Sequence, residues 1–112
     1  MEAAGIGRGR SIRVTLGLMN LNDFQDSLAQ DMPPEGLSDA LLALWWDANG
    51  NWARAHGFAQ DDTSVEGSWV HAYLHRVEGD LSNAGYWYRR AGKPASRAPL
   101  ADEWREIAGA LL

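Results

Sequence analysis

The chain has 112 residues, is 46% hydrophobic and 22% charged, and carries a net charge of −5, which is typical of one globular domain with a single core. The absence of cysteine excludes disulfides, thiol catalysis and cysteine-bound zinc or iron–sulfur clusters. The chain lacks both a signal-peptide core and an apolar run of the roughly 18–20 residues that a membrane helix needs, so we expect a cytoplasmic protein with no membrane association.

Charge is unevenly distributed along the chain. Eleven acidic residues lie between Asn20 and Tyr88 and face only Arg54 and Arg76. An acidic body repels a phosphate backbone, so this distribution disfavours nucleic acid as a partner.

Residues 1–18 are rich in glycine and arginine and have no helical period. We interpret them as a flexible basic arm or a start-site extension, with Met19 as the working initiator. Two alternatives stay open: an arm that contacts an acidic partner or RNA, and a short strand or helical turn packed on the body. We interpret residues 19–112 as a single helical domain.

Three helices are predicted in the first half of this domain. The first begins at Asn20 or Asn22 and ends before Pro33–Pro34, because proline disfavours a helical residue before it. The second is capped by Ser38, continues through Asn49 and is apolar around most of its circumference, so we expect it to be the most buried helix. The third runs from about 51 to 60. The first helix carries an apolar stripe made of Leu21, Phe24, Leu28 and Met32.

Three more helices are predicted in the second half. The first follows a capping box at Thr63 and Glu66 and runs to a tight turn at residues 78–80, and the next ends at Gly92. After a loop, the last runs over residues 100–112. The predicted fold is all-α, with about six short helices. Their apolar faces comprise Val65, Trp69, Ala72, Tyr73 and Val77, then Leu81, Ala84, Tyr88 and Ala91, and finally Leu100, Trp104, Ile107, Ala108 and Leu111.

The central helices repeat an earlier pair. Aligning Gly50 with Gly79, 29 residues apart, superposes Ala43 on Ala72. The pattern G-D-L-x-x-A-x-x-x-Y-x-x-A from Gly79 resembles part of a tetratricopeptide repeat, although the copies are closer than the roughly 34 residues of that family. The resemblance implies two helical hairpins flanked by an N-terminal and a C-terminal helix, used as a binding scaffold. The strings W-V-H-A-Y-L-H-R and Y-W-Y-R-R-A-G are also similar to a group of small bacterial proteins without an assigned activity.

Two histidines and a carboxylate share one helix face. His71, His75 and Glu78 are at positions i, i+4 and i+7, a spacing that suits a divalent metal bound by two histidines and one carboxylate. His56, on the preceding hairpin, could lie nearby. The alternative is a set of hydrogen-bonded interior histidines, with His75 paired to Glu78.

A second candidate is a surface that combines aromatic rings with cations. Six tryptophans are many for a chain of this length, and we expect one or two exposed indoles to mark a contact surface. The alternatives are cation–π packing on a solvated face and stacking on single-stranded nucleic acid. We call this predicted site the aromatic–cationic surface; it comprises Tyr86, Trp87, Arg89, Arg90 and Lys93.

Other acidic groups are given structural interpretations. The segment from Asp47 to Asn51 lacks the glycine position and the final glutamate of a calcium loop, so we expect a helix–helix turn with Asn49 and Gly50 in the left-handed region. Asp102 and Glu103 lie near a helix start, where negative charge is favourable.

The leading functional hypothesis is a non-enzymatic helical-repeat module, without a cofactor, that binds a protein partner or associates with itself. The alternative is a small metal-dependent or acid/base enzyme centred on His71, His75 and Glu78. In that alternative a divalent metal is the cofactor, and Tyr88 or Arg89 orients a substrate.

Overall fold

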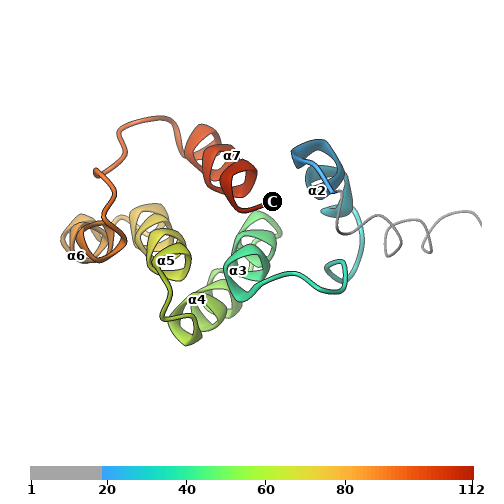
Figure 1. Ribbon diagram of the computed structural model, residues 1–112, viewed down its shortest axis with the longest axis horizontal. Coiled ribbons are helices and arrows are strands. Elements are labelled where there is room, and N and C mark those ends of the chain that lie inside the picture. Colours follow the sequence, from blue (N-terminus) through green and yellow to red (C-terminus); the bar gives the residue numbers. More distant parts are fainter. Residues whose placement is uncertain (1–18) are drawn as a thin grey trace, which may run out of the picture.

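The structure, a computed structural model, describes residues 19–112, and the predicted N-terminal arm lies outside this range. Within it the chain forms six α-helices and no strand, which confirms the all-α prediction (Figure 1). None of these helices is long and apolar enough to cross a membrane. The helices are α2 (Leu21–Ser27), α3 (Asp39–Ala48), α4 (Trp52–Asp61), α5 (Val65–Val77), α6 (Leu81–Ala91) and α7 (Leu100–Leu111).

Short polar side chains begin five of the six helices. The Asn20 side chain accepts a hydrogen bond from the Asp23 amide, and the Asp23 side chain accepts one from the Asn20 amide, so a capping box starts α2. The predicted capping box at Thr63 is wrong. Ser64 is the cap of α5, and its hydroxyl accepts from the Gly67 amide at 3.0 Å. The Asp62 carboxylate accepts from the Ser64 amide at 2.9 Å, an Asx turn just before α5.

Two turns of similar geometry connect α3 to α4 and α5 to α6. Gly50 has φ +83° and Gly79 has φ +88°, a conformation that glycine adopts without the steric penalty of a Cβ atom. The residues that follow, Asn51 and Asp80, also have similar backbone angles and cap α4 and α6. Asn49 has φ −91°, so the prediction that it shares the left-handed region is wrong, because Gly50 alone reverses the chain.

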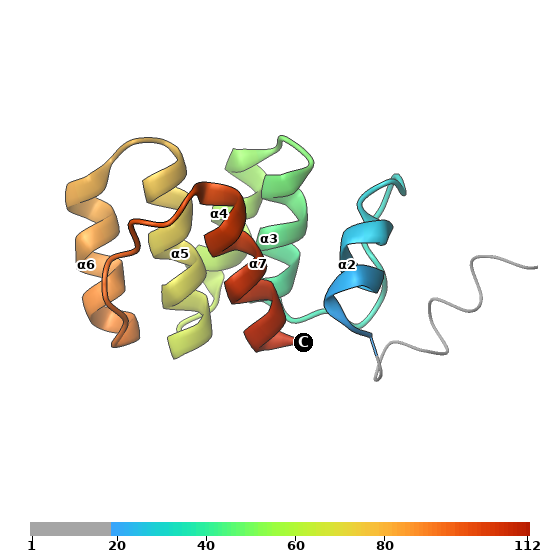
Figure 2. The ribbon, with the colours of Figure 1, turned by 90° about the horizontal axis from the view of Figure 1, so that it is seen from above.

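The helices pack mainly on their neighbours in the sequence. α3 packs on α4, α4 on α5, and α5 on α6, while α7 returns to lie against α2, α3 and α5. Figures 1 and 2 show α7 on one side of α3 and α5, with α4 on the other side. The face that α3 and α5 present together is therefore covered by a helix of the same chain.

The most buried helix is α5. Nine consecutive residues, Gly67 to His75, are buried, against five buried residues in α3. The prediction that the helix after Ser38 is the most buried is therefore wrong, because α5 packs against four helices: α3, α4, α6 and α7. Gly67 permits its close approach to the preceding loop, since a Cβ at this position would lie 2.2 Å from the carbonyl oxygen of Asp62.

A buried charged network holds α7 in place. Glu103 is 1% exposed; its carboxylate pairs with Arg76 of α5 at 2.8 Å and accepts a hydrogen bond from the Tyr88 hydroxyl of α6 at 2.6 Å. The Trp104 indole donates to the carbonyl of Leu44 at 2.9 Å. Three helices thus meet on one carboxylate that the sequence had placed at an ordinary helix start.

Four predicted core positions are exposed. Met32 is 61% exposed because α2 ends at Ser27, so this residue lies beyond the apolar stripe. Leu81 is 68% exposed, since the adjacent turn residues are exposed too and do not cover it. Val65, the first residue of α5, is 54% exposed, and Leu100, the first residue of α7, is 40% exposed. Each lies at or beyond a helix end, where packing partners are fewest.

Candidate functional site

All three histidines of the chain lie together between α4 and α5. His56 comes from α4, and His71 and His75 come from successive turns of α5. Each offers a ring nitrogen within 4.8 Å of the nitrogens of the other two. We call this group the histidine cluster. It forms because residues four apart share a helix face and because α4 packs against α5.

Hydrogen bonds orient all three rings. The Nε2 atoms of His71 and His56 are 3.0 Å apart, so one ring donates its proton and the other accepts it. The Nδ1 atom of His75 lies 2.7 Å from a carboxylate oxygen of Glu78. This contact leaves Nε2 as the free nitrogen of the His75 ring.

Aromatic side chains wall the histidine cluster. The Trp87 ring of α6 stacks on His71 with centroids 3.8 Å apart and an interplanar angle of 10°. Trp52 stacks on His56 at 4.9 Å and 14°, and its indole donates to the carbonyl of Leu74 at 2.7 Å. The imidazoles therefore lie in a largely apolar enclosure in which their orientations are constrained from two sides.

This environment favours the neutral form of the His56 and His71 imidazoles. Burial, followed by the neighbouring His56 and His75, lowers the pKa of His71 to about 4. Burial is also the main cause that lowers the pKa of His56. A neutral imidazole has a free lone pair, which is the form that binds a metal ion.

One polar atom in the cluster has no partner. His71 is 3% exposed, and its Nδ1 atom is the one buried side-chain nitrogen or oxygen among residues 19–112 that makes no hydrogen bond. Buried polar atoms are nearly always paired, so each exception calls for an explanation.

The nitrogen spacing fits a transition-metal ion after a small adjustment. Zn–N distances of about 2.0–2.1 Å in a tetrahedral site place two ligand nitrogens about 3.3 Å apart. The Nε2 atoms of His56 and His71 are 3.0 Å apart, so they would separate by only about 0.3 Å. The third nitrogen would close in from a separation of at most 4.8 Å.

The predicted set of His71, His75 and Glu78 is brought together in a modified form. His71 and His75 join the cluster, and the predicted pairing of His75 with Glu78 is present at 2.7 Å. Glu78 also forms a second, more exposed group with His75 and Asp80. His56 was not part of the predicted ligand set. Its position beside His71 depends on how α4 packs against α5, which the spacing of residues along one helix does not predict.

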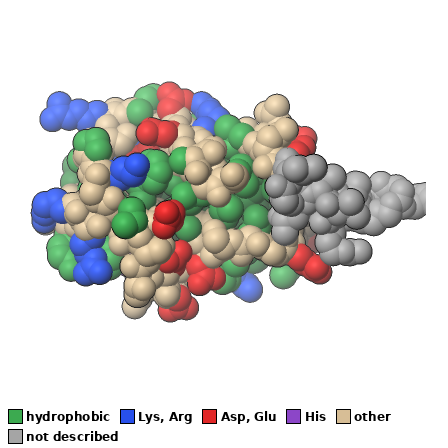
Figure 3. All heavy atoms as spheres, viewed as in Figure 1, with side chains coloured by type: hydrophobic (Ala, Val, Ile, Leu, Met, Phe, Trp, Pro, Cys, Tyr) green, Lys and Arg blue, Asp and Glu red, His purple; other side chains and the backbone are tan. Residues whose placement is uncertain are grey.

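The aromatic–cationic surface is partly turned inward. Trp87 is half-buried against His71, and the Arg90 guanidinium lies 5.2 Å from its ring. Lys93 lies over Trp69, 4.2 Å from the ring centroid. Tyr86 is 45% exposed, and Arg89 and Arg90 are exposed. In Figure 3, Lys and Arg side chains gather at the end of the molecule that α6 forms.

The expected exposed indoles are absent. All six tryptophans lie within the described residues, and each is buried or half-buried. The half-buried ones are covered by neighbouring side chains: Trp46 by Arg54, with its guanidinium 4.2 Å from the ring, Trp52 by His56, and Trp87 by His71. The prediction of exposed indoles is wrong because an arginine or a histidine side chain covers the indole face that the core does not contact.

Comparison with known proteins adds no relative: no family model, curated protein or solved structure matches this chain. The resemblance to tetratricopeptide repeats and to small bacterial proteins therefore stays a prediction. The candidate site rests on the residues of this chain alone.

Proposed function

We propose that this protein binds a divalent transition-metal ion through His56, His71 and His75. The observation that carries the proposal is the convergence of three imidazole nitrogens within 4.8 Å from two packed helices. Imidazole suits Zn²⁺, Cu²⁺, Ni²⁺ and Fe²⁺. Three protein ligands leave a fourth position for water or substrate, as catalytic zinc sites do. This arrangement is compatible with the metal-dependent enzyme hypothesis.

Glu78 supports the ion indirectly in this proposal. Its contact with Nδ1 of His75 at 2.7 Å fixes the ring so that Nε2 can bind the metal, the arrangement of a carboxylate–histidine–metal triad. His71 lacks such a partner at Nδ1 and is held instead by Trp87. Loss of an outer partner lowers metal affinity by about 10- to 100-fold, so we expect micromolar rather than nanomolar binding.

The test is a metal titration of untagged protein after treatment with a chelator. Zn²⁺, Ni²⁺ and Co²⁺ are followed by calorimetry, by Co²⁺ absorption and by the midpoint of thermal unfolding. We expect one equivalent of metal and a rise in the midpoint, because an ion that binds only the folded state stabilises it. Since the chain has three histidines, loss of diethylpyrocarbonate reactivity on metal addition reports on the cluster alone.

A variant and a control complete the test. His56→Gln removes one ligand at a half-buried position where folding is expected to survive, and we expect the metal response to fall at least tenfold. Asp61→Asn removes an exposed carboxylate from the end of the same helix and serves as the control. A His56→Gln protein that binds Zn²⁺ as tightly as the control would refute the proposal.

We propose a second function, protein interaction through the aromatic–cationic surface. The specific support is that, among the described helices, α6 packs on α5 and reaches α7 only through the Tyr88–Glu103 hydrogen bond. Its Tyr86, Arg89 and Arg90 side chains are exposed. The basic residues there suit an acidic partner or the acidic body of a second copy. The face of α3 and α5 does not suit a partner, because α7 covers it.

The interaction proposal is tested with Arg89→Ala combined with Arg90→Ala. We expect the variant to fold normally and to lose either a partner in pull-down or the self-association measured by sedimentation velocity. Arg97→Ala, an exposed loop residue outside α6, is the control. Equal partner recovery and equal sedimentation for both variants would rule the surface out.

A further inference from the structure

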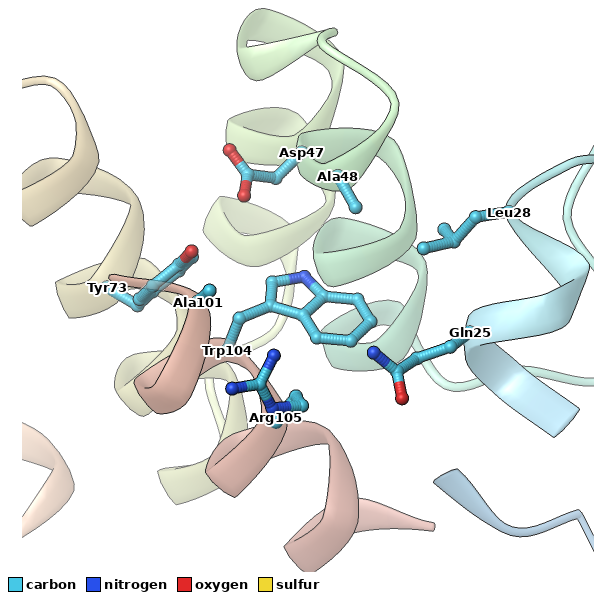
Figure 4. A pocket seen from close by; sticks show the side chains of 8 residues that line it. All are labelled: Gln25, Leu28, Asp47, Ala48, Tyr73, Ala101, Trp104 and Arg105. Atoms are coloured by element: carbon cyan, nitrogen blue, oxygen red, sulfur yellow. The ribbon is translucent and has the colours of Figure 1, made fainter. Parts of the chain in front are cut away.

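An open pocket lies on the other side of α5 from the histidine cluster. It has a volume of about 300 Å³ and lies where α2, α3, α5 and α7 meet (Figure 4). Tyr73 lines it, and its place midway between His71 and His75 in the sequence directs it to the opposite helix face. Its lining residues are Gln25, Leu28, Asp47, Ala48, Tyr73, Ala101, Trp104 and Arg105. We call it the Asp47 pocket.

The pocket combines apolar walls with one carboxylate. Leu28, Ala48 and the Trp104 ring provide apolar surface, and the Asp47 carboxylate lies on the α3 wall (Figure 4). Asp47 is half-buried. Burial raises its pKa to about 6, with no hydrogen bond or cation lowering it. At neutral pH a charged carboxylate therefore lies partly desolvated at the wall of a pocket.

The nearest cation on the pocket wall is already engaged. The Arg105 guanidinium pairs with Asp102 one turn earlier on α7. It is 44% exposed, so water screens its charge. Glu103 of the same helix likewise uses its carboxylate on Arg76 and Tyr88. Among residues 19–112 the Asp47 carboxylate thus has no cation to neutralise it.

We propose that the Asp47 pocket binds a small organic cation, a primary amine or guanidine on a short apolar stem. The Asp47 carboxylate accepts hydrogen bonds from the cationic group, which are the stronger, charge-assisted kind. The Trp104 ring and Leu28 contact the stem, and an indole face also attracts a cation. The volume of about 300 Å³ is at the lower limit for ligand pockets, which restricts the ligand to a small molecule.

This binding is independent of the metal proposal. The histidine cluster lies between α4 and α5 and is covered by Trp87 of α6, whereas the Asp47 pocket is lined from α2, α3, α5 and α7. The His56→Gln variant should therefore bind the amine normally. If metal binding at the histidine cluster fails, amine binding in the Asp47 pocket is unaffected, and the two results can be distinguished.

The probe is n-butylammonium, with butan-1-ol and butyrate as matched neutral and anionic analogues of the same stem. Calorimetry and tryptophan fluorescence measure binding to the full chain, since Trp104 lies in the pocket wall. We expect n-butylammonium to bind and both analogues to bind at least tenfold more weakly. A hydrogen-bonded charge contributes about 1.5–3 kcal/mol, so Asp47→Asn should weaken binding by about 10- to 100-fold.

Two further variants make the test decisive. Ala48→Leu places a larger side chain at the exposed rim and should block binding while Asp47 stays in place. Asp26→Asn removes an exposed carboxylate of α2 outside the pocket and should bind as the parent does. The proposal is overturned if n-butylammonium does not bind, if butan-1-ol binds equally well, or if Asp47→Asn and Ala48→Leu both keep the parent affinity.

Discussion

Replacing Asp47 by asparagine should stabilise the protein at neutral pH. Burial raises the pKa of this carboxyl from 3.8 in the unfolded chain to about 6 in the folded protein. A difference of about 2 pKa units corresponds to about 3 kcal/mol. Because the side chain is partly exposed and its charge is partly screened by water, we expect a gain of about 1–2 kcal/mol in the free energy of unfolding. Asparagine has nearly the same shape and carries no charge.

The sign of the pH dependence follows from which state ionises first. Between pH 3.8 and about 6 the unfolded chain has released its proton while the folded protein retains it, so native stability falls as pH rises. Above this window the Asp47 carboxyl is ionised in both the folded and the unfolded state, and the full cost of burying its charge remains. The gain from Asp47→Asn should therefore be small at pH 4 and constant above pH 7.

The assay is urea unfolding of parent and variant at pH 4, 5, 6, 7 and 8, followed by circular dichroism. Asp26→Asn, which removes one exposed carboxylate from the same acidic chain, corrects for the change in net charge. A gain from Asp47→Asn that equals that of Asp26→Asn at every pH would refute the reasoning. A loss of stability at pH 7 would refute it as well, since it would mean that the carboxylate has a stabilising partner.

Three further predictions concern the core. In chelated protein the lowered pKa of His71, about 4, should reduce the free energy of unfolding by about 3 kcal/mol as pH falls from 6.5 to 4; urea unfolding of the parent and His71→Asn at each pH measures this. Glu103→Ala should cost about 3 kcal/mol at pH 7, because it leaves the Arg76 charge buried without its partner, and urea unfolding measures the loss. Gly67→Ala should lower the free energy of unfolding by about 1–3 kcal/mol because the added methyl group overpacks the site. Gly57→Ala should raise it by about 0.5–1 kcal/mol, since an added Cβ there meets nothing within 4 Å. Thermal unfolding midpoints of the two variants measure the difference.

Each of these predictions has a contradicting outcome. A parent protein whose stability below pH 6.5 falls no faster than that of His71→Asn would show that this imidazole is not buried in neutral form. A Glu103→Ala protein as stable as the parent at pH 7 would show that the ion pair with Arg76 adds nothing to stability. Equal effects of Gly67→Ala and Gly57→Ala would contradict the close contact with the Asp62 carbonyl.

Local signals in the sequence predicted the helices well. Gly50, Gly79 and Gly92 reverse or end the chain where their spacing indicated, because the left-handed conformation is a property of glycine itself. The pairing of His75 with Glu78 was also predictable, since residues three apart on one helix are neighbours. These features depend on a few adjacent residues and need no knowledge of how the helices pack.

Features that depend on contacts between distant helices were missed. Glu103 has the same local sequence whether it caps a helix or lies buried, and only the approach of Arg76 and Tyr88 decides which. Asp47 lies near a turn by its sequence, and its pocket exists because α2 and α7 meet α3 there. Likewise the face of Trp87 was expected to be open, and it stacks on His71 of the neighbouring helix.

The position of α7 has a consequence for synthesis on the ribosome. α2 packs on α7, and Phe24 of α2 stacks on Trp104 of α7 with ring centroids 5.6 Å apart. The ribosome makes α2 before α7, so the growing chain lacks the α7 contacts of α2 until α7 has been synthesised. The Phe24 ring, which is 0% exposed in the finished fold, cannot stack on Trp104 before that point.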